Sequence, residues 1–111
     1  MANWRAILAV AVLVPSIAQA QTPGLVKSAE AFNRCVADEA RRLEPSGEAA
    51  DLIARAAVYS CHALKATLDV EIANSVSSRK DMDDLTAQSA ADARDGALLV
   101  VISTRANKRS K

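Results

Sequence analysis

Two cysteines bound the stretch that decides the fold, residues 35–61, which has the sequence CVADEARRLEPSGEAADLIARAAVYSC. Apolar residues recur every three or four positions on both sides of Glu44-Pro45-Ser46-Gly47, and this spacing is typical of amphipathic helices. Pro45 has no amide hydrogen and disfavours a helical conformation at the residue before it, so one helix ends here and another begins. The stretch therefore predicts a helical hairpin, in which two antiparallel helices are joined by a short turn.

The helix before the turn is predicted to begin near Thr22, which can cap the first backbone N–H groups, with Pro23 at the first helical position. Cys35 lies at the edge of its inward stripe, which comprises Ala29, Phe32, Val36, Ala40 and Leu43. The opposite side is charged, and Asp38 and Arg42 have the spacing of an i,i+4 ion pair.

The helix after the turn is predicted to be capped by Ser46, with Glu48 and Asp51 in its first turn, where the helix dipole favours negative charge. Its apolar residues fall on one stripe, which comprises Ala50, Ile53, Ala54, Ala57, Cys61, Leu64, Leu68 and Ile72. We expect one continuous helix through this stripe, with Phe32 and Leu64 both facing the core.

Cys35 and Cys61 are the only cysteines, and we expect them to form a disulfide. Closing this loop stabilises the fold by about 3.5 kcal/mol in the chain-entropy description. Counted from Ser46, one cysteine lies 11 residues before and the other 15 after, an offset of about 6 Å along two antiparallel helices. Helix crossing or an asymmetric turn must absorb that offset, or else the bond joins two molecules.

Three other uses of the cysteines are less favoured by their spacing. A thiol redox site lacks the Cys-x-x-Cys arrangement that lowers a thiol pKa. A metal site with His62 is disfavoured because Cys61 and His62, as neighbours on a helix, point about 100° apart. Haem attachment at Cys61-His62 would need a cysteine where Val58 stands. The sequence thus predicts no metal and no cofactor.

A third helix is predicted after the polar segment 74–80, which has no periodicity. Ser78 or Asp81 can cap it, and Asp81, Asp83 and Asp84 then occupy its first turn, where the helix dipole accounts for them without a cation site. Residues 97–102 are consecutively apolar and suit a strand or a helix. Because no second strand is available to pair with them, we expect the buried end of a long helix.

The first twenty residues are predicted to be a secretory signal peptide. One basic residue, Arg5, precedes the apolar run 6–14, and Ala18 and Ala20 form the small-x-small pattern of a cleavage site after Ala20. The run is about half the length that spans a bilayer. We therefore expect a signal peptide at 1–20, a helical domain at 21–106 and a basic C-terminal tail at 107–111, in a periplasmic or extracellular protein.

The expected fold class is all-α, a small three-helix antiparallel bundle made of the helical hairpin plus a third helix and stapled by one disulfide. After removal of the signal, 13 basic and 13 acidic residues remain, and this balance argues against nucleic-acid binding. Arg105, Lys108, Arg109 and Lys111 cluster at the C-terminus. They form a solvated tail or make weak contact with an anionic membrane surface.

No catalytic motif is present in the sequence. His62 is the only histidine, there is no Gly-x-Ser-x-Gly elbow, and the glycines are scattered. We expect a small exported, non-enzymatic module that binds a protein partner, of the inhibitor, immunity or adaptor type. The alternatives are an envelope stress protein or holdase chaperone, and a membrane-surface protein that acts through the apolar and basic segment 97–111.

Overall fold

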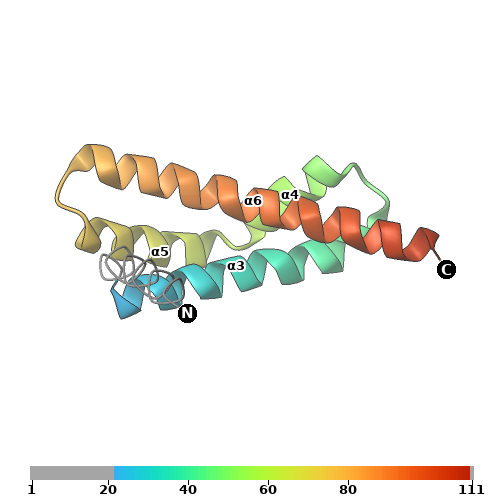
Figure 1. Cartoon of the computed structure of the whole chain (residues 1–111), viewed down its shortest axis with the longest axis horizontal. Coiled ribbons are helices and arrows are strands. Elements are labelled where there is room, and N and C mark those ends of the chain that lie inside the picture. The colour runs from blue at the N-terminus through green and yellow to red at the C-terminus, as the bar shows by residue number, and fades with distance from the viewer. Residues whose placement is uncertain (1–21, 111) are drawn as a thin grey trace, which may run out of the picture.

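The computed structural model describes residues 22–110, which fold into α-helices joined by short connections (Figure 1). No strand occurs within this range, so the predicted all-α class is confirmed. The predicted signal peptide, residues 1–20, lies outside the described residues. The helices are α3 (Pro23–Leu43), α4 (Ala50–Ser60), α5 (His62–Ser75) and α6 (Arg79–Arg109), and the short 3-10 helix η1 (Glu44–Ser46) follows α3.

The helices are arranged around α3 and α6, which both run along the length of the molecule (Figure 1). The chain passes from α4 to α5 on its way back along α3, so that α4 and α5 cover successive parts of α3. The longest helix, α6, then packs mainly against α3 and α4 and much less against α5. This uneven packing leaves the α5 end of the bundle more open than the α4 end.

The predicted count of three helices is wrong for residues 22–110, which contain four α-helices. The predicted second helix breaks at Cys61, whose backbone angles (φ −101°, ψ 23°) are not helical. No proline or glycine marks the break, and the apolar spacing continues through it. Apolar periodicity alone therefore predicts one helix where the structure has two, α4 and α5.

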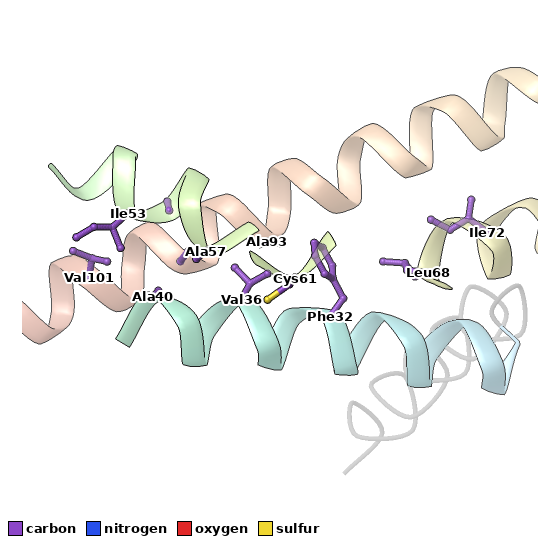
Figure 2. Close-up of a cluster of buried hydrophobic side chains, with 12 residues drawn as sticks. Phe32, Val36, Ala40, Ile53, Ala57, Cys61, Leu68, Ile72, Ala93 and Val101 are labelled. Carbon is purple, nitrogen blue, oxygen red and sulfur yellow. The ribbon is translucent and has the colours of Figure 1, made fainter. Parts of the chain in front are cut away.

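The core is aliphatic and rich in alanine, with one aromatic ring, Phe32, beside Cys61 and Leu68 (Figure 2). Its buried residues are Phe32, Val36, Ala40, Ile53, Ala54, Ala57, Cys61, Leu68, Ile72, Ala93, Ala97 and Val101. The predicted inward position of Phe32 is confirmed. The prediction for Leu64 is wrong, because its side chain is 36% exposed. The break at Cys61 turns α5 so that Lys65 is partly buried and Leu64 faces outward.

The predicted caps of the first and last helices are confirmed. The backbone N–H of Leu25 donates to the Thr22 hydroxyl (3.2 Å), and that of Asp81 donates to the Ser78 hydroxyl (3.0 Å). Each bond satisfies a backbone donor that has no partner within its helix. The ends of α3 and α6 are therefore fixed by residues that the sequence marks.

The turn between α3 and α4 differs from its prediction. Ser46 does not cap α4, which begins at Ala50 with Ala49 as its N-cap. The Ser46 hydroxyl instead accepts a hydrogen bond from the Glu48 backbone within the turn (3.4 Å). Gly47 has φ 77°, a left-handed conformation that glycine adopts without steric cost, and it ends η1. The turn is thus longer than expected.

Other local predictions are corrected in detail. The connection between α5 and α6 is shorter than 74–80, because α5 runs through Ser75 and α6 begins at Arg79. Asp81 lies in the first turn of α6, but Asp83 and Asp84 lie beyond it, and Asp84 pairs with Lys80 (2.9 Å).

The predicted pair of Asp38 and Arg42 does not form. Arg42 pairs with Glu39 (2.6 Å), and Asp38 pairs with Arg41 (3.0 Å). Both observed pairs have i,i+3 spacing, which brings side chains as close on a helix as i,i+4 spacing does.

The apolar run 97–102 is helical, as expected, and lies inside α6. The same helix continues to Arg109, so most of the segment predicted as a basic tail at 107–111 is helical.

Candidate functional site

An extended, largely apolar depression lies between α3, α5 and α6, at the more open end of the bundle. We call it the α3–α5–α6 groove. It has a volume of about 260 Å³ and is lined by Leu25, Ala29, Leu68, Ile72, Leu85, Gln88, Ser89 and Asp92. Leu68 and Ile72 form its floor, and both residues are buried members of the core. The groove exists because α6 packs closely on α3 and α4 but diverges from α5 (Figure 1).

The rim of the groove is acidic. Asp92 stands at the α6 side. Glu71 is not among the lining residues; its carboxylate lies against Gly24 at the contact between α5 and α3, where a Cβ atom on Gly24 would come within 2.8 Å of its Oε2. Among residues 22–110, neither Asp92 nor Glu71 forms an ion pair. The Asp92 carboxylate at the groove is therefore available to a positively charged partner.

The disulfide fixes the middle of the bundle beside this groove. Cys35 and Cys61 are bonded within one chain, with their Cα atoms 6.1 Å apart, as the sequence predicts. The bond joins α3 to the break between α4 and α5. Phe32, one turn before Cys35, packs between Cys61 and the groove floor at Leu68 (Figure 2). The disulfide thus fixes α3 relative to the start of α5, and these two helices form walls of the groove.

His62 is exposed at the start of α5. Its Nδ1 lies 3.1 Å from the Tyr59 carbonyl oxygen, and its ring is tilted against the Tyr59 ring with centroids 5.7 Å apart. Within the described range, no group of three or more His, Cys, Asp or Glu residues has a geometry that could hold a metal ion. Both contacts of His62 are with Tyr59 in the last turn of α4, across the break at Cys61.

The basic residues predicted to cluster at the C-terminus have different environments in the structure. Lys108 donates to the Glu44 carboxylate (2.7 Å), and the Arg105 guanidinium donates to the Glu48 carbonyl. Both contacts clamp α6 onto the turn after α3. Arg109 is exposed, and Lys111 lies outside the described residues. Sequence analysis missed the Glu44–Lys108 pair because its partners are 64 residues apart.

None of the helices within 22–110 is long and apolar enough to cross a membrane.

The chain matches no protein-family model, no curated protein and no solved structure. The groove and its rim are therefore the features on which a functional proposal rests.

Proposed function

We propose that this protein is a small exported, non-enzymatic module that binds another protein through the α3–α5–α6 groove. The observation that carries the proposal is the combination of an apolar floor with an acidic rim. Its occupant is an amphipathic helix of a partner protein, with aliphatic residues on one face and Lys or Arg beside them. Helices commonly dock into apolar grooves in this way, with anchors spaced three or four residues apart.

The apolar floor supplies the main driving force for such docking. Leu68 and Ile72 are almost covered by their own chain, whereas Leu85 at the lip is partly exposed. A partner helix laid along the groove would remove the exposed part of Leu85 from water and fill the space above the floor. Association of this kind is favoured in proportion to the apolar area removed from water.

The acidic rim supports a basic partner. Asp92 lines the groove and forms no ion pair within residues 22–110. Complementary charge across an interface chiefly raises the association rate and excludes wrong partners, and salt screens it. We therefore expect binding that weakens with ionic strength.

Binding is favoured over catalysis by the groove's polar groups. Its polar lining residues are Gln88, Ser89 and Asp92. The Ser89 hydroxyl donates to the Thr86 carbonyl oxygen of its own helix (2.9 Å), so its proton is not directed to a base. An activated nucleophile needs such a base within hydrogen-bond reach.

The proposed compartment is periplasmic or extracellular, with signal cleavage after Ala20. The disulfide is consistent with an oxidising compartment, where such bonds persist. The sequence pattern of residues 1–20 supports the same location. A stapled bundle of this size holds the groove walls in place without a large core.

The test uses two synthetic amphipathic helical peptides with the same leucine face, one with lysine and one with glutamate on the other face. Fluorescence anisotropy of the labelled peptides measures binding to the protein recovered from a secretion-competent host. We expect saturable binding of the Leu/Lys peptide only. Leu85→Lys should weaken that binding about tenfold or more, about 1.4 kcal/mol. Val70→Lys adds the same charge on the outer face of α5 and should leave binding unchanged.

Other outcomes would reject the groove. Equal binding of both peptides would indicate the holdase alternative, since a holdase recognises apolar surface regardless of charge. Binding to anionic vesicles that Leu85→Lys leaves intact, but that Arg109→Gln weakens, would indicate the membrane-surface alternative. Loss of peptide binding in both Leu85→Lys and Val70→Lys would show that added charge, and not the groove, is responsible.

A further inference from the structure

A second surface lies on the face of α6 that points away from the bundle. Ala93, Ala97 and Val101 face inward, and on the opposite side Leu99 is 65% and Ile102 is 54% exposed. These two belong to a row of exposed residues spaced alternately three and four apart. We call this row the outer seam of α6; it comprises Asp92, Asp95, Leu99, Ile102, Ala106 and Arg109.

The spacing of the outer seam is that of a coiled coil. Alternating steps of three and four residues give a repeat of 3.5 residues, which keeps one stripe of a helix facing a partner helix. The order of residue types along the seam is acidic, acidic, apolar, apolar, small and basic. The bundle does not cover these residues, so the stripe is free to meet another helix.

We propose that a second copy of this chain packs on the outer seam, with the two α6 helices antiparallel. A two-fold axis midway between Leu99 and Ile102 sets Leu99 against Ile102 of the second copy. The same register sets Asp92 against Arg109, and Asp95 against the small side chain of Ala106. This register therefore pairs apolar side chains at the centre of the seam and opposite charges at its two ends.

Charge order selects the antiparallel arrangement. A parallel pair would place Asp92 beside Asp92 and Arg109 beside Arg109, and like charges across an interface are destabilising. Among residues 22–110, no ion pair engages Asp92, Asp95 or Arg109. The antiparallel pair provides partners for Asp92 and Arg109 at both ends of the seam.

The interface is small, since each copy contributes two large apolar side chains. Interfaces of this size are typical of weak, transient association. The dimer is therefore expected to be concentration-dependent. It leaves Leu85 and the apolar floor of the α3–α5–α6 groove uncovered, but it engages Asp92, which belongs to both surfaces. For this reason the primary tests use Leu99 and Arg109.

The test is sedimentation velocity of the protein recovered from a secretion-competent host, over a range of concentrations at low salt. The sedimentation coefficient should rise from the monomer to the dimer value. Leu99→Lys and Arg109→Asp should each lower the association constant about tenfold, about 1.4 kcal/mol. Val70→Lys is the matched control, since Val70 is 59% exposed on α5 and should leave association unchanged. At about 1 M salt, where the Debye length is about 3 Å, association should weaken.

A charge exchange tests the antiparallel register itself. Asp92→Arg and Arg109→Asp should each weaken association, and the double variant should restore it, because each exchanged pair is again opposite in charge. Helix content by circular dichroism identifies variants that do not fold. Concentration-independent monomer for the unmodified protein would overturn the proposal. So would a dimer indifferent to Leu99→Lys and Arg109→Asp, or a double variant that fails to recover.

Discussion

The Nζ of Lys108 donates a hydrogen bond of 2.7 Å to the carboxylate of Glu44, although the two residues are 64 positions apart. Glu44 is only 3% exposed, and Lys108 reaches it from the last turn of α6. The contact ties the end of the longest helix to the turn where the chain first reverses. It is one of the polar links that join distant parts of the chain.

Loss of the Lys108 ammonium group should cost more unfolding free energy than loss of the Glu44 charge alone. Lys108→Ala leaves a buried carboxylate without its partner, and we expect a loss of about 1–3 kcal/mol of unfolding free energy. Glu44→Gln removes the charge but keeps an oxygen acceptor for Lys108, so its cost should be smaller. Chemical denaturation measures both.

The exposed pair Lys80–Asp84 provides the control for this comparison. Lys80→Ala should change the unfolding free energy by no more than about 0.5 kcal/mol, because exposed ion pairs contribute little. A cost for Lys108→Ala no greater than that for Lys80→Ala would contradict the role assigned to the buried contact.

Because α5 changes direction after the break at Cys61, truncation of Leu68 and of Leu64 should have different effects on stability. Leu68 is buried, and Leu68→Ala should cost about 2–5 kcal/mol. Leu64 faces outward, and Leu64→Ala should cost about 0.5 kcal/mol or less. Thermal or denaturant melting of the two variants decides the matter. Similar, large losses for both would mean that α4 and α5 form the single helix expected from the apolar spacing.

The disulfide predicts both a mass and a stability change. Protein from a secretion-competent host, measured by intact mass under denaturing, non-reducing conditions, should be a monomer two hydrogens lighter than the dithiol and should begin at Gln21. Replacing both cysteines by serine should lower the unfolding free energy by about 3.5 kcal/mol. A disulfide-linked dimer mass would contradict the bond within one chain, and a retained N-terminus would contradict the predicted cleavage.

The contact between Glu39 and Arg42 on α3 should make the stability of the fold depend on pH. Hydrogen bonds from the Arg42 guanidinium hold the pKa of Glu39 below its usual value. A carboxyl whose folded pKa is lowered stabilises the fold above the unfolded pKa, and this contribution is lost as the pH falls through the folded value. An NMR titration should show Arg42→Gln raising the pKa of Glu39. Arg41→Gln, which removes the neighbouring bond to Asp38, should not change it.

Local signals in the sequence predict the ends of the outer helices and much of the core. Thr22 and Ser78 cap as expected because a cap depends on residues within one turn. Phe32 and Val36 are buried as expected because α3 is one unbroken helix, so its apolar period keeps its phase. The bond between Cys35 and Cys61 within one chain is also as expected, and the structure excludes for this chain the alternative of a bond between two molecules that the sequence left open.

The features that sequence analysis missed depend on how helices are placed relative to one another. The break at Cys61 has no proline or glycine signal, and it shifts Leu64 out of the core. The α3–α5–α6 groove depends on the divergence of α5 from α6, which no local pattern encodes. The seam spacing on α6 is visible in the sequence, but its exposure is known only once Ala97 and Val101 are seen to face the bundle.

Five of the buried core residues are alanines: Ala40, Ala54, Ala57, Ala93 and Ala97. Such small side chains let helix backbones approach closely, and they leave little room for a larger group. A substitution such as Ala97→Leu would raise hydrophobicity and yet force the helices apart, at a typical cost of about 1–3 kcal/mol. Side-chain volume is therefore expected to restrict the sequences compatible with this bundle more strongly than polarity does, so that serine or glycine would be better tolerated at these positions than leucine or phenylalanine.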